Sequence, residues 1–378
     1  MKKFSIFYIA VLVCTAIFSW GFVDPGLFPW MSGLAPYQRP LSTLVFVHRS
    51  LTSGIFIFLL SGFTYFYLTI LGKIDKEAIA ADVKRLIAIT AAILFFSFPA
   101  FSYDIFNYVT TAKMFFVHRE NPYIVKPVEI PNDPNLSFTR AANKVALYGP
   151  VWIGLTGIPQ LLGRGNIWLT IASYKLMHTV LYLLFCLFIF RQTRSLKNVI
   201  FFAFNPLVLI EVLISSHNDI VMMMLGLLGV VFYGIHRWRH RLAGMLLFVF
   251  SICIKGATAV LVPLFFIQTV KDKKFFLGFV LMLIFFFVVA PLREELYPWY
   301  AVWFLSFASL LPFKKYPIAI TVSLILSVSL ELRHVPYMML LSYEGWGPGA
   351  RWFVSYVPLG IYLAYVLVLK KFLCRKNG

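Results

Sequence analysis

The stretch SYDIFNYVTTAKMFFVHRENPY, residues 102–123, decides how this chain is organised, because it follows an apolar run and opens the longest polar interval. At about 100° per residue its polar and apolar side chains separate onto two helix faces, which predicts an amphipathic helix lying along a membrane surface. The polar face carries Asp104, Asn107, Thr111 and His118, and the apolar face carries Ile105, Val109, Ala112 and Phe116. Asp104 in the first turn has two interpretations: a helix cap that satisfies free N–H groups, or a catalytic base presented just outside the bilayer.

Composition identifies the class of protein. The chain has 378 residues, of which 60% are hydrophobic, 18% aromatic and 13% charged. Average globular proteins have about a quarter charged residues, so these values predict an all-α polytopic membrane protein. The formal charge of +19 does not indicate nucleic-acid binding, since Lys and Arg occur in short clusters between apolar runs, as the positive-inside rule requires. The four cysteines form neither a CxxC pair nor a disulfide framework.

The alternation of apolar runs with basic clusters predicts about twelve membrane spans with both termini in the cytoplasm. We expect a single integral membrane unit with N-terminal transmembrane helices over 1–101, an external catalytic loop over 102–166, and C-terminal transmembrane helices over 167–378. Within the loop, 148–162 is apolar but too short to cross, which predicts a re-entrant or surface-lying segment. Farther on, Lys255-Gly256 interrupts an apolar run with basic flanks, which predicts two short helices meeting on the external side.

Polar residues collect at the external ends of the predicted spans. The loop over 102–166 is rich in Lys and Arg, against the positive-inside tendency, and therefore indicates an anionic ligand. Four separate loops bring polar groups to this surface: Asp104, His217, Asn218, Asp219, Lys255, Arg293, Glu294 and Glu295. Each has an ordinary structural explanation, such as a capped turn at 217–219, a snorkelling Lys255, or an aromatic belt around Trp299. Together they favour a polar site at membrane level.

Several of these segments resemble one enzyme superfamily. Residues 102–123 resemble the first-loop signature of GT-C glycosyltransferases, in which an Asp follows a membrane helix and precedes an aromatic-rich amphipathic helix and Asn-Pro-Tyr. YGPVW (148–152) is similar to the Tyr-x-Pro segment that ends that loop. SSHNDI (215–220) and YPWYAVWFL (297–305) resemble later motifs of the bacterial and archaeal mannosyltransferase branch that uses polyprenyl-phosphate sugars. Two spans precede the Asp loop here, where many relatives have one, which leaves the role of the first hundred residues open.

The resemblance implies inverting transfer of a hexose, expected to be mannose, from a polyprenyl-phosphate donor to a lipid or glycan acceptor on the extracytoplasmic face. The superfamily's catalytic Asp corresponds to Asp104, which would act as general base. We expect a prokaryotic plasma-membrane protein whose site faces outside and whose partners are the donor, the acceptor and membrane lipids. The expected substrate-binding residues are Asn107, Lys113, Tyr123, Tyr148, His217, Asn218, Asp219, Lys255, Arg293, Trp299 and Tyr300.

Neither a cofactor nor a metal ligand is predicted. A monophosphate leaving group carries fewer charges than a nucleotide diphosphate, so fixed cations such as Lys255 and Arg293 are expected to replace a divalent metal. The chain contains no DxD motif, although a divalent metal held by Asp104 is the alternative. The alternative function is a secondary transporter or flippase for a lipid-linked anion, which would use the same cations and the interrupted run at Lys255.

Overall fold

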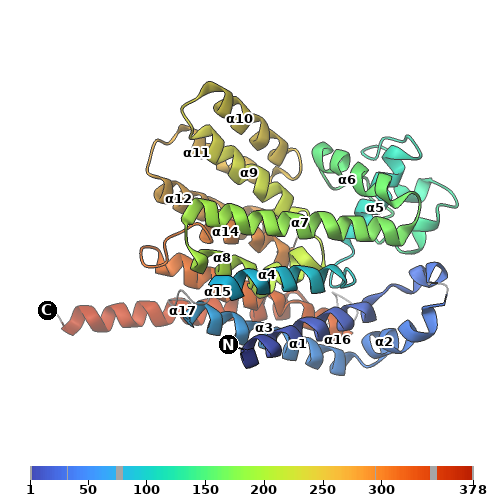
Figure 1. Cartoon of the computed structure of the whole chain (residues 1–378), viewed down its shortest axis with the longest axis horizontal. Helices are drawn as coiled ribbons and strands as arrows, with labels where there is room; N and C mark the ends of the chain where they lie inside the picture. Colours follow the sequence, from blue (N-terminus) through green and yellow to red (C-terminus); the bar gives the residue numbers. More distant parts are fainter. Residues whose placement is uncertain (1, 32, 74–79, 294, 341–346, 377–378) are drawn as a thin grey trace.

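The computed structural model describes residues 2–31, 33–73, 80–293, 295–340 and 347–376, and every regular element within these ranges is helical (Figure 1). The α-helices are α1 (Lys2–Ser19), α2 (Ala35–Val47), α3 (Arg49–Lys73), α4 (Ala80–Phe95), α5 (Asp104–Phe116), α6 (Pro150–Gly163), α7 (Ile167–Thr193), α8 (Leu196–Ala203), α9 (Asp219–Tyr233), α10 (Trp238–Ile252), α11 (Pro263–Phe266), α12 (Lys271–Ile284), α13 (Ala290–Arg293), α14 (Ala301–Ala308), α15 (Pro317–Glu331), α16 (His334–Leu340) and α17 (Gly347–Lys376). The 3-10 segments are Trp20–Phe22, Pro25–Trp30, Pro127–Glu129, Pro134–Ser137, Gly256–Leu261 and Pro298–Tyr300, and the π-helical segments are Val208–Ile214 and Phe285–Val289. The predicted all-α class is confirmed.

Several of these helices identify a membrane protein. Among the described residues, five are long and apolar enough to cross a membrane: Phe4–Phe22, Arg49–Lys73, Ile167–Thr193, Lys271–Leu292 and Pro317–Met339. Helix α8 and the π-helical segment Val208–Ile214 meet at 66° and add a sixth span if the bent pair counts as one. The expected number of about twelve spans is not confirmed and stays a prediction.

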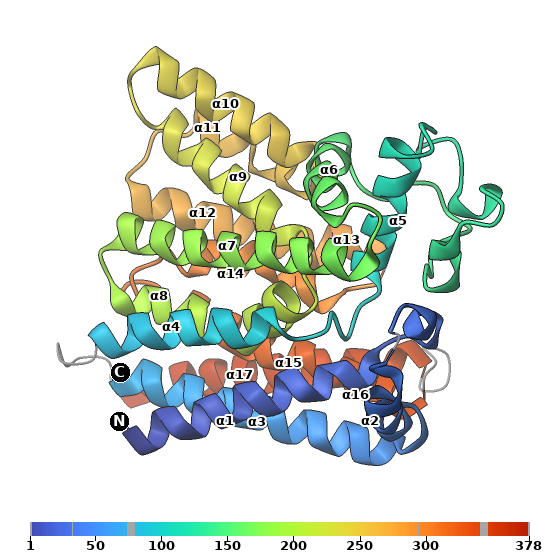
Figure 2. The same cartoon turned by 45° about the vertical axis from the view of Figure 1, so that its right-hand side comes forward.

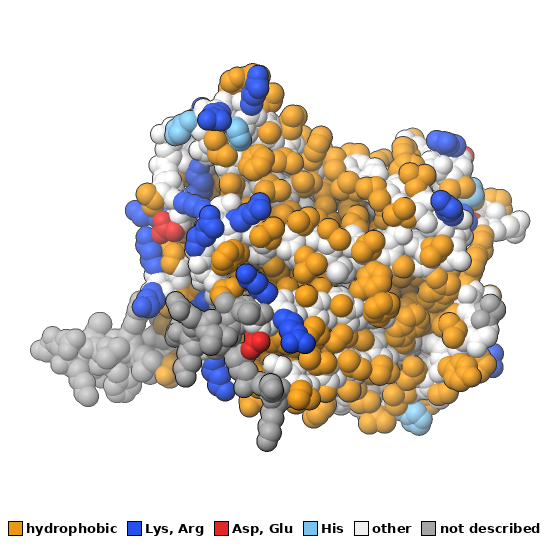
Figure 3. Space-filling view, in the orientation of Figure 1, with side chains coloured by type: hydrophobic (Ala, Val, Ile, Leu, Met, Phe, Trp, Pro, Cys, Tyr) orange, Lys and Arg blue, Asp and Glu red, His pale blue; other side chains and the backbone are white. Residues whose placement is uncertain are grey.

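The site-bearing helices lie at one end of the molecule. Figures 1 and 2 show α1, α3, α4, α7, α15 and α17 running side by side, with α2, α5 and α6 gathered at one end and both chain termini toward the other. Figure 3 shows Lys and Arg side chains gathering toward the end with the termini, and hydrophobic side chains across the surface between the two ends. This distribution agrees with the positive-inside rule if the end with the termini is cytoplasmic.

Close helix packing places the start of α9 beside the end of α10. These two helices form a hairpin in which a Cβ atom at Gly229 would lie 2.9 Å from the carbonyl oxygen of Gly244. Small residues at such positions let two backbones approach closely inside a membrane. Asp219, the first residue of α9, is thereby brought next to Lys255, which follows α10.

A buried lysine fixes the turn before α9. The Lys175 Nζ on α7 donates to the Ser97 Oγ at 2.8 Å and to the carbonyl oxygen of Ile214 at 3.2 Å, and it also contacts the carbonyl of Leu213. These carbonyls end the π-helical segment and have no helical N–H partner, so the ammonium group satisfies them. The turn over 215–218 therefore starts from a fixed position.

Candidate active site

Asp104 opens α5 but does not cap it. Tyr103 occupies the cap position without a side-chain bond, and the N–H of Asp104 donates to the Ser102 Oγ at 3.2 Å. The Asp104 side chain, which is 24% exposed, instead faces His217 and a large pocket. Of the two interpretations of this residue, the arrangement favours a role in the site.

His217 lies behind Asp104, fully buried between two carboxylates. Its Nδ1 is 3.4 Å from the Asp104 Oδ2, and its Nε2 is 3.1 Å from the Glu211 Oε2. The imidazole ring stacks on Trp299, with 3.9 Å between ring centroids and an angle of 17° between the planes. A carboxylate oxygen therefore lies near each ring nitrogen and Trp299 covers one face, which favours this orientation of the ring.

Two unusual turns hold this pair together. Phe101, in the turn before α5, has a φ of 69°, and Ser216, in the turn before α9, has a φ of 59°. Residues other than glycine adopt this left-handed region mainly where the surroundings impose it, often at functional sites. The Ser215 Oγ donates to the carbonyl oxygen of Ala100 at 2.7 Å, so a direct hydrogen bond joins the two turns.

Lys255 is held over aromatic rings by a buried carboxylate. Its Nζ lies 3.1 and 3.3 Å from the two carboxylate oxygens of Asp219, which also accepts the Trp303 indole N–H at 2.5 Å. The same Nζ is 4.6 Å from the centroid of the Tyr300 ring. Lys255 therefore presents a positioned positive charge to the pocket.

The helix break at Lys255, predicted from the sequence, also binds the loop that follows α5. Because α10 ends before this break, the carbonyl of Ile254 is available to accept the Gly149 N–H at 3.0 Å. A Cβ atom at Gly149 would lie 2.1 Å from the carbonyl oxygen of Cys253, so only glycine permits this approach. The contact sets Tyr148 on the pocket wall.

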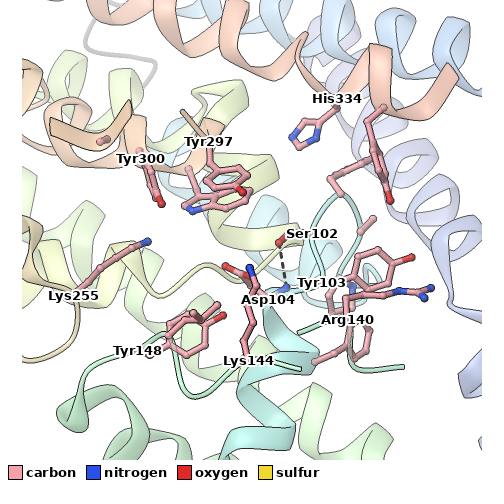
Figure 4. A pocket seen from close by; sticks show the side chains of 18 of the residues that line it. Ser102, Tyr103, Asp104, Arg140, Lys144, Tyr148, Lys255, Tyr297, Tyr300 and His334 are labelled. Carbon is pink, nitrogen blue, oxygen red and sulfur yellow. Dashed lines mark hydrogen bonds between the residues drawn. The ribbon is translucent and has the colours of Figure 1, made fainter. Parts of the chain in front are cut away.

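These elements surround one pocket of about 1400 Å³. Small-molecule sites usually have about 300–1,000 Å³, so this pocket has room for more than one ligand. Its polar and aromatic lining includes Asp104, Arg140, Lys144, Tyr148, Lys255, Tyr297, Trp299, Tyr300 and Trp303. Figure 4 shows the side chains of Asp104, Lys144, Tyr148 and Lys255 arranged around a common space.

The charges around Asp104 favour its ionised form. Burial would raise the pKa of Asp104, but the adjacent His217, and then Lys255, outweigh burial and hold this pKa below its ordinary value. Burial would lower the pKa of His217, but Asp104 and Glu211 together raise it to about 9. Burial and the charge of Asp104 raise the pKa of Tyr148 well above its usual range, so its phenol stays protonated. The site combines an ionised carboxylate with positive neighbours.

The pocket gathers part of the expected site. Asp104, Tyr148, Lys255, Trp299 and Tyr300 line it. His217 and Asp219 lie one layer behind, each in contact with a lining residue. Both polar atoms of the buried Asn218 side chain lack a hydrogen-bond partner among the described residues, so the cap that was the alternative role for Asn218 is not formed.

The other expected residues lie elsewhere. Asn107 borders a small neighbouring cavity and accepts the Ala141 N–H at 3.2 Å. Lys113 pairs with Asp133 at 2.8 Å, and the Tyr123 hydroxyl donates to the carbonyl of Tyr148 at 2.8 Å. The Arg293 side chain and Glu294 lie outside the described residues, and Glu295 pairs with Arg333 and Arg351.

Several residues that the sequence prediction did not include also face or adjoin the pocket. They are Arg140, Lys144, Tyr297, Trp303, Glu211, Glu331 and His334. Arg140 and Lys144 belong to the basic loop that indicated an anionic ligand, but nothing in the sequence distinguished them from its other cations. Glu211 and Glu331 each sit within an apolar run, and an acidic residue in such a run is a signal of function. Glu211, Glu331 and His334 are the described residues grouped closely enough to hold a metal ion.

Helices that can cross a membrane and a pocket joining a carboxylate to fixed cations define a membrane protein with a polar, cation-lined pocket. The family model of MptA_B, described as alpha-(1->6)-mannopyranosyltransferase, N-terminal domain, matches residues 9–271, more than half of the chain. The chain belongs to this family of mannosyltransferases, and it is therefore a membrane-bound glycosyltransferase. No curated protein and no solved structure matches the chain. Membership confirms the resemblance to mannosyltransferases, whereas the polyprenyl-phosphate donor stays a prediction.

Proposed function

We propose that this protein transfers a mannosyl residue from a polyprenyl-phosphate donor to a lipid or glycan acceptor on the extracytoplasmic face, with inversion. In this reaction the acceptor hydroxyl oxygen forms a bond to the anomeric carbon while the bond from that carbon to the phosphate oxygen breaks. The hydroxyl proton goes to a base, and the polyprenyl phosphate leaves with the bonding electrons. Because the family is one of alpha-(1->6)-mannopyranosyltransferases, an α-(1→6) linkage is the one to test first.

The observation that carries this proposal is the ionised Asp104 on the pocket wall. Its carboxylate is exposed to the pocket on one side and faces His217 on the other. A base of this kind must be free of a proton before reaction and stabilised after accepting one. His217, fixed between Asp104 and Glu211, keeps the carboxylate oriented and ionised.

The cations of the pocket support a phosphate-bearing donor. Lys255 and Lys144 line the same space as Asp104, and Arg140 joins them from the loop, where it pairs with Asp24. Positive groups near the bridging oxygen would stabilise the charge that develops on the leaving phosphate. Fixed cations suffice for a monophosphate, so this step needs no metal ion at the phosphate.

The apolar part of the pocket supports a lipid substrate and gives the first hundred residues a role. Phe22, Val45 and Phe46, which come from the segment around α2, line the pocket together with Met338. An apolar wall next to a cationic one fits a prenyl chain attached to a phosphate. Helix α5, which begins at the pocket residue Asp104, lies at the end opposite the basic clusters (Figures 1 and 3), and this position supports an extracytoplasmic site in a prokaryotic plasma membrane.

The test uses purified full-length protein in proteoliposomes. One sample contains polyprenyl-phosphate mannose with a radiolabelled sugar, and a parallel sample contains labelled nucleotide-linked mannose. We expect covalent transfer of label to an extracted lipid or oligomannoside acceptor with the lipid donor alone. Transfer from the nucleotide sugar alone would contradict the donor, and translocation of intact lipid-linked sugar without transfer would favour the transporter.

A further inference from the structure

A second cluster of ionisable side chains lies on the far side of His217 from Asp104. The Nε2 of His334 is 2.9 Å from the Glu211 Oε1 and 3.7 Å from the Glu331 Oε2, and the three ligand atoms lie within 4.8 Å of one another. All three residues are buried. We propose that Glu211, Glu331 and His334 bind one divalent transition-metal ion.

Glu331 is the residue that most requires such an ion. Its side chain is fully buried, and neither carboxylate oxygen has a hydrogen-bond partner among the described residues. Glu211, by contrast, contacts two imidazoles, those of His217 and His334. A buried carboxylate without hydrogen bonds is costly unless it is paired with a positive charge or coordinates a metal. A dication shared by the two glutamates would neutralise both.

The distances between the donor atoms suit a shared ion. Oxygen and nitrogen ligands about 2.0–2.2 Å from a zinc-like ion lie about 2.8–3.6 Å apart in octahedral or tetrahedral geometry. Of the separations from the His334 Nε2, 2.9 Å lies within this range and 3.7 Å lies at its upper edge. The three groups can therefore reach one ion after small side-chain movements.

The sequence around the cluster has the spacing of a carboxylate metal site. Glu331-Leu332-Arg333-His334 is a Glu-x-x-His segment, and helical carboxylate metalloproteins combine such a segment with a glutamate from another helix. Here Glu331 ends α15 and His334 begins α16, so the pair flanks a turn. Glu211 comes from the π-helical segment Val208–Ile214, a conformation that recurs at functional sites.

The surroundings give the ion an outer shell and an entry path. The Nε2 of His217 contacts the second oxygen of Glu211, as groups behind metal ligands commonly do. The rings of Phe56 and Phe101 pack around His334 at centroid distances of 6.0 and 5.5 Å. Because His334 also lines the large pocket, the ion can enter from there and retain an open position.

The donor set indicates the class of ion and its role. One imidazole with two carboxylates favours Zn²⁺, Mn²⁺ or Fe²⁺ over soft ions and over Ca²⁺. The ion would join the π-helical segment to the turn between α15 and α16 and so fix this wall of the pocket. Figure 4 shows His334 away from both Lys144 and Lys255, so fixed cations can still hold the donor phosphate.

Metal content of the purified full-length protein tests this site without measuring turnover. The protein in detergent is incubated with Zn²⁺, Mn²⁺ or Fe²⁺, separated from free ion by gel filtration, and measured by inductively coupled plasma mass spectrometry. We expect roughly one equivalent of one ion per chain. Glu331→Gln and Glu211→Gln should lower the bound metal per chain at least tenfold. The exposed-loop variant Glu129→Gln and the pocket variant Asp104→Asn should bind as much metal as the wild type.

Cobalt provides a second measurement that does not depend on the folding of a variant. Co²⁺ bound to the wild-type protein should give visible d–d absorption that Zn²⁺ displaces. A monodisperse wild-type protein that holds less than a tenth of an equivalent of each ion and gives no cobalt band would overturn the proposal, and Glu331 would then carry a proton. Undiminished binding by folded Glu331→Gln would overturn it as well.

Discussion

Asp104 and His217 form an ion pair that sets the pH range of the proposed reaction. His217 holds the pKa of Asp104 below its ordinary value, so the carboxylate persists as pH falls and is lost only near that low pKa. If Asp104 is the base, kcat/KM should change little between pH 7 and pH 5. In His217→Ala, burial still raises the pKa of Asp104, and the imidazole that opposed this effect is absent. The acid limb of the pH–rate profile should therefore move to higher pH.

A pH–rate profile of His217→Ala checks this prediction. We expect a rate at least about tenfold lower at pH 7, a further loss at pH 5, and normal expression. His48→Ala, an exposed histidine outside the pocket lining, serves as the control and should match the wild type. A variant of His217 with the wild-type profile would remove it from the site, and a loss of folded yield alone would make its turn structural.

Lys144 offers the cleanest test of phosphate recognition. Removing Lys255 would leave the buried Asp219 unpaired, whereas Lys144 is exposed at the pocket edge. Lys144→Ala should lower kcat/KM for the lipid donor roughly tenfold, which corresponds to a loss of about 1–2 kcal/mol of transition-state stabilisation. The effect should be modest because a cation near solvent is partly screened. Steady-state kinetics with varied donor measure this. Lys126→Ala, outside the pocket lining, is the control, and equal effects of both variants would contradict a specific phosphate contact.

Gly149 joins the basic loop to the helix break before Lys255. An added methyl group would meet the carbonyl of Cys253 at 2.1 Å, so Gly149→Ala must displace Tyr148 or the break before Lys255. We expect a loss of about 1–3 kcal/mol in the free energy of unfolding, typical of overpacking, together with reduced transfer.

Gly154→Ala on α6 is the matched control, since nothing lies within 4 Å of its Cβ position. It should leave activity unchanged and stability equal or slightly higher. Thermal unfolding of both variants in detergent measures the difference. Equal stability and transfer in the two variants would mean that the contact at Gly149 does not position the site.

The sequence predicted the elements that carry the site better than the contacts between them. The periodicity of 102–123 predicted α5, and the Lys255-Gly256 interruption predicted the break after α10. Both signals are local. The contact between Glu211 and His334 joins residues 123 positions apart in the sequence. It depends on a π-helical segment that no sequence pattern predicted. That Asp104 does not cap α5 and instead faces His217 likewise depends on contacts that the sequence does not give.

The basic clusters gather toward the end of the molecule that holds the chain termini, and α5 lies at the other end (Figures 1 and 3). We therefore predict that the loop after α5 is extracytoplasmic and the turn before α10 is cytoplasmic. In a variant without native cysteines, Val128→Cys should react with a membrane-impermeant maleimide in intact cells. His236→Cys should react only after permeabilisation, and the reverse pattern would invert the proposed topology.

The number of spans is the feature that the sequence left least certain. Apolar runs predicted about twelve crossings, yet several of them fold as short or bent helices, such as α8 with Val208–Ile214 and α10 with Gly256–Leu261. Hydropathy counts apolar residues and does not report where a helix bends. These breaks also shape the site. Backbone carbonyls at the breaks accept hydrogen bonds from outside the helix, and the turns that follow position Lys255 and His217.

A comparison of two aspartate variants tests whether Asp104 is the base of a mannosyl transfer. Wild-type protein, Asp104→Asn and Asp82→Asn are reconstituted with labelled polyprenyl-phosphate mannose and acceptor, and covalent transfer is counted. Asp82 is an exposed first-turn residue of α4, so its variant controls for the loss of a helix-terminal charge. We predict a drop of about a hundredfold or more for Asp104→Asn alone, with unchanged insertion and melting. Near-normal transfer by a folded Asp104→Asn protein would show that Asp104 is not the base.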